Sequence, residues 1–201
     1  MSNNDTKETV GKILQRNDKV VLEVGCGKSK KAGRIGIDQC RLPGVDIVAD
    51  LEKGLPFFPD DSVDEIHCRS VLEHIANFEL LLKDIVRILK PSGHANIFVP
   101  HFSNPYYYSD YTHKRTFGYY SFYYFVDYEK QPRRKVPSFY TDLRIEVHSL
   151  KLVFTSPFFF SRRVKKFLGF FINSCTIFQE LYELHLCYLF PCHGVEITIG
   201  P

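Results

Sequence analysis

The chain has 201 residues, of which 44% are hydrophobic and 24% are charged, and its formal net charge is +3. This composition is typical of a globular protein with one domain, and it excludes a disordered chain or a collagen-like one. No apolar run approaches the ~20 residues that are needed to cross a bilayer.

The positive charge is concentrated in residues 129–166. Ten Lys or Arg against three Asp or Glu give this stretch +7, which leaves −4 for the rest of the chain. A local basic face attracts phosphate, acidic glycan, nucleic acid or anionic lipid, although an ordinary solvated face has the same composition.

The cysteines favour a reducing compartment. None of the six belongs to a CxxC pair and no signal peptide is recognisable, so we expect free thiols and a cytoplasmic protein. Cys187, Cys192 and His193 lack a fourth ligand at a suitable spacing, and we therefore expect no metal site.

In chain order, the sequence predicts a short amphipathic helix at 6–16 and strands at 19–24, 34–38, 46–49, 63–67 and 95–99. Most of these strands are apolar runs without alternation, which predicts burial on both faces of a sheet. Apolar residues from Phe78 to Leu89 recur at helical spacing, and Pro91 and Gly93 should end that helix. Strands interleaved with helical connections predict a parallel α/β sheet.

The second half of the chain has a different composition. An aromatic-rich segment occupies about 101–142 and is expected to form a lid, although more than half of its rings should belong to the core. Strand patterns at 143–154 and 195–199 flank a Phe-rich helical stretch at 158–190. We find no repeat and no linker, so we expect a single domain over 1–201, with a core at about 19–100 and a C-terminal part at 143–201.

The turn in VVLEVGCGKSKKAGRIGID (20–38) is the first indication of a ligand. It does not match a phosphate loop, and the third glycine of a dinucleotide motif is replaced by Lys30. Glu23, Asp38 and Asp50 end three consecutive predicted strands, at the edge where open parallel sheets bind ligands. Carboxylates only accept hydrogen bonds, which suits ribose hydroxyls or an amine.

Several segments together resemble the class I S-adenosylmethionine-dependent methyltransferases, specifically the methyltransferase type 11 group. The resemblance implies a Rossmann-like, seven-stranded, mostly parallel sheet with the last strand antiparallel. KSKKAGR (28–34) leaves a shortened or missing helix between strands 1 and 2, which a cofactor without phosphates tolerates. The matching segments are VLEVGCG (21–27), GID (36–38), DIVADLEKGLPF (46–57), DDSVDEI (60–66), SVLEHI (70–75) and ILKPSG (88–93).

The resemblance also implies roles for individual residues. The loop around the methionine end of the cofactor corresponds to Glu23, Gly25, Cys26 and Gly27. Asp38, with Gln39 beside it, corresponds to the ribose site, and Asp50 with Leu51 to the adenine site. Arg69 and Ser70 lie in the segment beside the sulfonium.

SDYTHKRTF (109–117) resembles the D-x-x-H-x-R-x-F segment of many type 11 members. His113 is the candidate general base and Asp110 the group that orients it, although His113 packing in a lid loop is an open alternative. His74 is a second candidate base, although its place near the start of a connection favours a helix-capping or buried role. On the acceptor side we expect His101, Tyr108, Tyr111 and Arg115.

These residues predict methyl transfer from S-adenosylmethionine to an oxygen, or less favourably a nitrogen, of a small-molecule, glycan or lipid-linked acceptor. The alternatives are a non-catalytic binding protein, a nucleic-acid methyltransferase, for which no NPPY-like segment is present, and an NAD-dependent oxidoreductase. FFFSRRVKKFLGFFI (158–172) is a candidate for peripheral contact with a membrane. The favoured alternative is a helix packed beside the sheet, with the basic residues on its solvent-exposed side.

Overall fold

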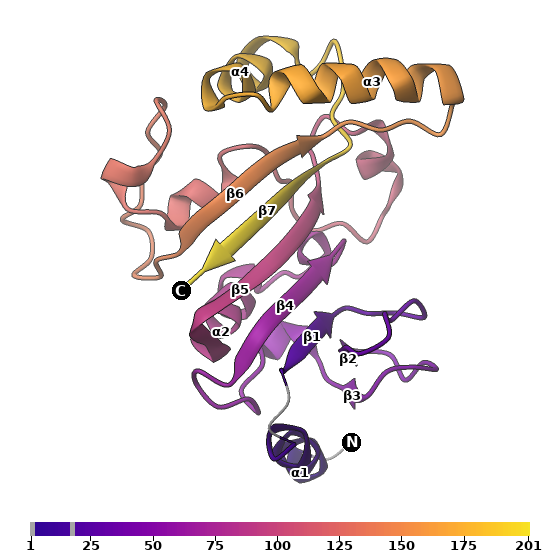
Figure 1. Ribbon diagram of the computed structural model, residues 1–201, viewed down its shortest axis with the longest axis vertical. Helices are drawn as coiled ribbons and strands as arrows, with labels where there is room; N and C mark the ends of the chain where they lie inside the picture. Colours follow the sequence, from indigo (N-terminus) through magenta and orange to yellow (C-terminus); the bar gives the residue numbers. More distant parts are fainter. Residues whose placement is uncertain (1–2, 17–18) are drawn as a thin grey trace.

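The computed structural model describes residues 3–16 and 19–201, and the fold is α/β (Figure 1). Two helices lie in the N-terminal half, α1 (Asn3–Leu14) and α2 (Phe78–Ile88), and two near the C-terminus, α3 (Phe159–Ile172) and α4 (Thr176–Leu181). The strands are β1 (Val21–Val24), β2 (Ile35–Asp38), β3 (Ile47–Val48), β4 (Val63–Arg69), β5 (Leu89–Pro100), β6 (Glu146–Val153) and β7 (Gly194–Gly200).

The seven strands form one sheet in the order β3-β2-β1-β4-β5-β7-β6. The neighbouring pairs from β3 to β5 are parallel, and β7 is antiparallel to both β5 and β6. This confirms the predicted mostly parallel sheet with an antiparallel last strand. The strand order reverses between β1 and β4, which is the place where open α/β sheets bind ligands.

The connection between β1 and β2 contains no helix over its described residues 25–34, as the short sequence there predicts. The chain leaves β1 through Gly25 and Gly27, whose φ angles are +67° and +52°. Positive φ is easily adopted by glycine, so the two glycines allow the chain to turn directly toward β2.

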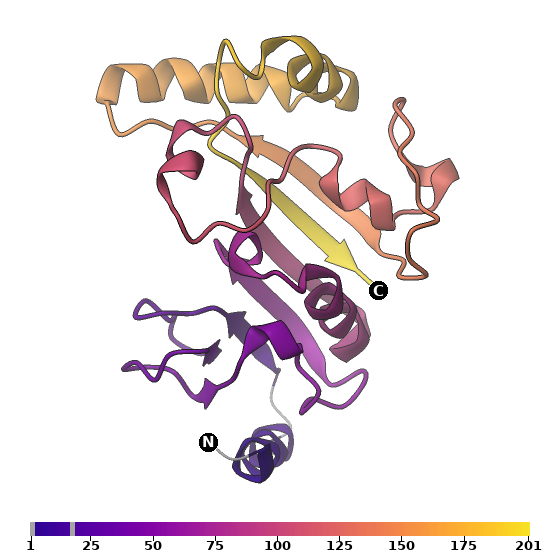
Figure 2. The same ribbon diagram turned by 180° about the vertical axis from the view of Figure 1, so that it is seen from behind.

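The two faces of the sheet are covered differently. In Figure 2, α2 and the segment 101–142 lie over the sheet, whereas Figure 1 shows the opposite face with no helix in front of the strands. Burial alternates along β1, with Leu22 and Val24 on the covered side, and the open side of β4 carries polar residues such as His67. The prediction that the strands are buried on both faces is therefore wrong, because the helix that should cover the second face is missing.

Helix α2 confirms the predicted helical pattern, with Phe78, Leu81, Leu82 and Ile85 buried against the sheet. Strand β5 starts earlier than predicted, because Pro91 and Gly93 lie within it instead of separating it from the helix. A register shift between Val63 and Glu65 in the β4–β5 pair accommodates these residues.

Helices α3 and α4 and a π-helical turn, Tyr182–Leu186, form a layer at the end of the sheet from which β6 leaves and β7 returns (Figure 1). Asn173 anchors this layer, because its side chain both accepts from Leu152 N–H and donates to Leu152 C=O at 2.8 Å. Of α3 itself, only Gly169 and Ile172 are buried. None of the described helices combines the length and apolarity that a membrane span requires.

Candidate active site

A cavity of about 440 Å³ opens at the carboxyl ends of β1, β2 and β4. Five residues that the sequence assigned to the cofactor line it: Gly25, Asp38, Gln39, Leu51 and Ser70. The other lining residues are Glu52, Val71, His74, Ile75, Thr112 and Lys114. The cavity thus joins the expected nucleoside side to the segment 109–117.

The glycine turn is held at this cavity by hydrogen bonds to Asp38 and by its close approach to Val71. Asp38 accepts the N–H of Gly27 and the N–H of Cys40, both at 2.9 Å, so its carboxylate is fixed at the end of β2. A Cβ on Gly25 would lie 2.1 Å from Cγ2 of Val71, which shows how closely the turn approaches the chain that follows β4. Each Asp38 oxygen retains an acceptor position that a ribose hydroxyl can use.

A second cavity, of about 680 Å³, extends from the same turn over the open face of the sheet. Glu23, Cys26 and Arg69 line it, and Gly25 borders both cavities. Glu23 accepts the N–H of Lys31 at 3.0 Å, so the loop that replaces the helix is held beside this cavity. The cofactor site is consequently open on this side.

Two predicted cofactor residues do not line either cavity. Asp50 caps the short 3₁₀ helix Leu51–Lys53 by accepting the N–H of Glu52 at 3.1 Å. Gly27 shapes the turn through its contact with Asp38. Both residues therefore shape the chain around the site through hydrogen bonds that involve backbone N–H groups.

A cluster of Glu73, His74 and His113 lies next to the 440 Å³ cavity, which His74 lines. One ligand atom from each of these three side chains lies within 4.8 Å of the others. The ring centroids of His74 and His113 are 4.8 Å apart. The 3₁₀ helix Leu72–His74 and the segment after β5 therefore meet here.

The ring of His113 is oriented mainly by the backbone. Its Nδ1 lies 2.8 Å from the carbonyl oxygen of Tyr107, so the neutral ring carries its proton on Nδ1 and leaves Nε2 as the acceptor. Oδ2 of Asp110 lies 3.6 Å from that Nε2. Asp110 itself accepts the Oγ1–H and the N–H of Thr112, at 2.6 and 2.9 Å.

Glu73 is a buried acid that pairs with no Lys or Arg among the described residues. The residue is 1% exposed, and its Oε2 has no hydrogen-bond partner in this part of the chain. Burial raises the pKa of Glu73 to about 7, and the Asp110 carboxylate acts in the same direction, while a backbone hydrogen bond opposes them. A buried, strongly perturbed acid beside a cavity is typical of functional sites.

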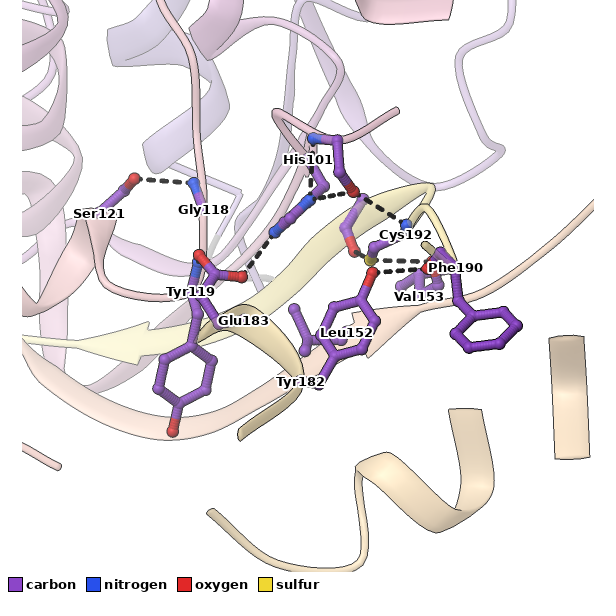
Figure 3. Close-up of polar contacts among 12 residues, drawn as sticks. His101, Gly118, Tyr119, Ser121, Leu152, Val153, Tyr182, Glu183, Phe190 and Cys192 are labelled. Carbon is purple, nitrogen blue, oxygen red and sulfur yellow. Dashed lines mark hydrogen bonds and ion pairs between the residues drawn. The ribbon is translucent and has the colours of Figure 1, made fainter. Parts of the chain in front are cut away.

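The residues expected on the acceptor side are placed differently. His101 is fully buried, with Nδ1 2.8 Å from Ser103 Oγ and Nε2 2.8 Å from Glu183 Oε2 (Figure 3), so its prediction as a pocket residue is wrong. The packing of the π-helical turn onto the end of β5, which places Glu183 there, could not be seen in the sequence.

Tyr108 and Tyr111 are 69% and 96% exposed and line none of the cavities described above. Arg115 donates to the carbonyl oxygens of Ile75 and Ala76, so it fastens the segment 109–117 to the chain that follows β4. Most of the aromatic rings in 101–128 are nevertheless core residues, as predicted: six are buried, and Phe102 and Tyr120 pack partly buried against the core.

Sequence reasoning missed Glu73 as part of the site, together with Thr112 and the Glu52–Lys114 ion pair. The only signal for Glu73 in the sequence was its place among Val71, Leu72 and Ile75 of the SVLEHI segment, because acidic residues are rarely buried unless they have a partner. The pairing of Glu52 with Lys114 joins residues 62 positions apart and has no local signal.

The model of a methyltransferase domain family matches residues 4–140, about two thirds of the chain. The chain belongs to this methyltransferase family. A search of curated proteins found no significant match to the sequence.

Solved structures agree with the methyltransferase fold. A SAM-dependent methyltransferase from Archaeoglobus fulgidus is 19% identical, with a TM-score of 0.53, and the alignment covers 100% of this chain and 95% of that one. The YcgJ protein from Bacillus subtilis is 14% identical, with a TM-score of 0.50 and coverage of 96% and 97%. At these identities the likeness concerns the fold. The family match makes this protein a methyltransferase, and these structures show that it has the same fold as other methyltransferases.

Proposed function

We propose that this methyltransferase transfers the methyl group of S-adenosylmethionine to a hydroxyl oxygen of a small-molecule, glycan or lipid-linked acceptor. The observation that carries the proposal is the contact of His113 with His74, because His74 lines the same cavity as Gly25 and Asp38. A group that can accept a proton therefore lies beside the predicted cofactor site, where an oxygen acceptor with a high pKa needs it.

S-adenosylmethionine supplies an activated methyl group, so the protein mainly has to align donor and acceptor. In our proposal Asp38, Leu51 and Ser70 hold the nucleoside part, and the acceptor lies toward His74 and Thr112. His113 takes the acceptor's proton on Nε2, while the hydrogen bond that its Nδ1–H donates to the carbonyl oxygen of Tyr107 keeps the other ring nitrogen protonated. Asp110 positions Thr112 more directly than it positions His113.

His113→Ala should reduce turnover by about 10²–10⁴-fold and leave the affinity for S-adenosylmethionine nearly unchanged. The assay follows transfer of labelled methyl from S-adenosylmethionine to a panel of sugars, phenols and polyprenyl alcohols, and mass spectrometry of the product identifies the methylated atom. The control is His148→Ala on β6, an exposed histidine outside the site.

Normal turnover in His113→Ala would show that His113 is not the base and would favour the alternative that it only packs in the loop. Methylation of an amine alone would replace oxygen by nitrogen as the acceptor atom. Cofactor binding without any methyl transfer would favour the non-catalytic alternative, and methylation of RNA or DNA alone would favour the nucleic-acid alternative.

We further propose that α3 contacts an anionic membrane on which a lipid-linked acceptor resides. Six phenylalanines of the segment 158–172 are between 57% and 81% exposed: Phe158, Phe159, Phe160, Phe167, Phe170 and Phe171. The alternative that these rings pack against the sheet is therefore wrong. Their exposure on a helix that lies beyond the end of the sheet (Figure 1) is typical of an interaction surface.

The polar residues of α3 fit the charge of such a membrane. Phe160, Val164, Phe167 and Phe171 follow helical spacing on one exposed face, and Arg163 and Lys166 lie at its edge. Arg162 and Lys165 lie on the opposite side of the helix, where they donate to backbone carbonyl oxygens of residues 156, 157 and 191. An amphipathic helix of this kind lies at the headgroup boundary without crossing the bilayer, and each basic residue there contributes about 1 kcal/mol. A cytoplasmic location facing anionic lipid is part of this proposal.

Flotation with phosphatidylglycerol vesicles tests the docking surface. We expect binding that weakens with salt and that the double variant Phe160→Ser, Phe167→Ser abolishes, whereas Tyr111→Ser, which removes an equally exposed ring elsewhere, retains it. No association with the vesicles would exclude membrane docking. A dimer in light scattering that the double variant dissociates would show that a second copy covers this surface.

A further inference from the structure

Glu73, His74 and His113 have a feature that the proposed base does not explain. A free base requires only one histidine, whereas here two imidazoles and a carboxylate converge within 4.8 Å. Glu73 adds a buried oxygen, Oε2, that has no hydrogen-bond partner within residues 3–16 and 19–201. Leaving such a group unsatisfied costs roughly 1–3 kcal/mol, more if it is charged, so the position calls for a partner.

The two basic side chains that follow His113 do not provide this partner. Lys114 pairs with Glu52 at 2.6 Å, and the guanidinium of Arg115 donates to the carbonyl oxygens of Ile75 and Ala76. Among the described residues, no Lys or Arg forms an ion pair with Glu73. A small cation between the three side chains would balance the charge of Glu73 and occupy its free oxygen.

The outer contacts of both histidines match those of metal ligands. His113 Nδ1 bonds to the carbonyl oxygen of Tyr107, and His74 Nδ1 lies 2.9 Å from Oγ1 of Thr112, whose hydroxyl donates to Asp110. Histidine ligands commonly donate their second ring N–H to a carbonyl or to a carboxylate-linked group, which leaves the other nitrogen free to coordinate. Here that nitrogen is Nε2 in both rings.

We propose that Glu73, His74 and His113 form a binding site for a first-row divalent transition-metal ion at the wall of the cofactor cavity. Two histidines and one carboxylate suit Zn²⁺, Fe²⁺ or Co²⁺, and three protein ligands leave a coordination position open. Ligand atoms about 2.0–2.1 Å from a tetrahedral ion lie about 3.3 Å apart. The side chains therefore close inward on binding.

The binding site does not depend on the proposed reaction, but its consequence for catalysis does. An acceptor hydroxyl that occupies the open position would be polarised and its pKa lowered by the ion. His113 would then be a ligand instead of a free base, so His113→Ala would lower both metal affinity and turnover.

The test is titration of the metal-depleted full chain with Co²⁺, followed by visible absorption and by competition with Zn²⁺. We expect one ion per chain with the bands of an N/O site, and an affinity at least tenfold lower in Glu73→Gln, His74→Ala and His113→Ala. His94→Ala is the matched control: this histidine lies 3.8 Å from Glu65 on another part of the sheet, and its loss should leave the affinity unchanged.

Glu73→Gln preserves the shape of the side chain, so we expect this variant to fold even if the alanine variants do not. No Co²⁺ binding, equal binding in all variants, or the sulfur-to-cobalt absorption of a site formed by the free cysteines would overturn the proposal. Loss of turnover in His113→Ala without any metal binding would overturn it and leave the general base intact. Metal binding without methyl transfer would support the metal site and contradict the proposed function.

Discussion

Gly25 and Gly27 are two residues apart and both have positive φ, but their surroundings differ. A Cβ on Gly25 would collide with Val71, whereas a Cβ on Gly27 would meet nothing within 4 Å. Both substitutions incur the backbone strain of a side chain at positive φ, and only the first also displaces the chain that follows β4. Substitution of Gly27 therefore measures the backbone strain alone, whereas substitution of Gly25 measures the strain together with the collision with Val71.

Gly27→Ala should lower the free energy of unfolding by about 1 kcal/mol. Gly25→Ala should lower it further and should also weaken cofactor binding, because Val71 lines the cofactor cavity. Urea denaturation and calorimetry of the two variants measure these differences. Equal effects of the two substitutions would show that the contact between Gly25 and Val71 has no consequence.

Asp38→Ala should weaken S-adenosylmethionine binding by about 1.5–3 kcal/mol, the scale of hydrogen bonds to a charged group. The carboxylate both faces the cavity and holds the N–H of Gly27, so its loss removes a ligand contact and loosens the turn. Calorimetry measures the change, with the exposed Asp142→Ala as control. An unchanged affinity would remove Asp38 from the ribose site.

At the scale of elements, the segment 109–117 is fastened to the cofactor side by Glu52. This carboxylate, in the 3₁₀ helix Leu51–Lys53, accepts from Lys114 at 2.6 Å and from the N–H groups of Ala76 and Asn77 at 2.9 and 2.8 Å. Burial pushes the pKa of Glu52 upward, but the bond from Lys114 and the two backbone amides outweigh it and lower the pKa to about 2.

Because the pKa of Glu52 is depressed on folding, its contribution to stability is present above about pH 4.5 and is lost as the pH falls toward 2. The side chain is 30% exposed, so we expect Glu52→Gln to lower the free energy of unfolding by only about 1 kcal/mol at pH 7. Denaturant titrations at pH 7 and pH 3 should show that the difference shrinks at the lower pH. Glu129→Gln, at an exposed position, is the control, and a difference that does not change with pH would contradict the assignment.

The sequence predicts elements better than it predicts the faces they present. The mostly parallel sheet with its antiparallel last strand, the missing helix after Gly27 and the helical spacing of α2 follow from local patterns and from the family resemblance. Short strands such as Ile35–Asp38 contain too few residues to distinguish alternation from a buried run, so the open face of the sheet could not be predicted.

The site was predictable on its cofactor side only. Asp38 and Gly25 belong to local motifs, whereas Glu73 and His113 meet across 40 positions of the chain through tertiary packing. His101 illustrates the converse: a histidine at the end of a strand suggested a pocket, but its partner Glu183 lies 82 residues away in the layer formed by α3 and α4.

At the scale of the whole molecule, this methyltransferase has a sheet with one covered face and one open face. The cofactor turn lies between them, and its two cavities, of about 440 and 680 Å³, share Gly25. A dinucleotide would need a helix N-terminus for its pyrophosphate, and the described residues 25–34 contain none. A nucleoside with no phosphates fits this architecture, since carboxylates and backbone groups are sufficient to bind it.

Calorimetric titration of the full chain with S-adenosylmethionine, S-adenosylhomocysteine and NAD therefore tests the central claim most directly. The turn with Asp38 should bind S-adenosylmethionine and its demethylated product in the micromolar range, at roughly −7 to −9 kcal/mol, and should not bind NAD. Absence of binding to S-adenosylmethionine, or a preference for NAD, would contradict the account.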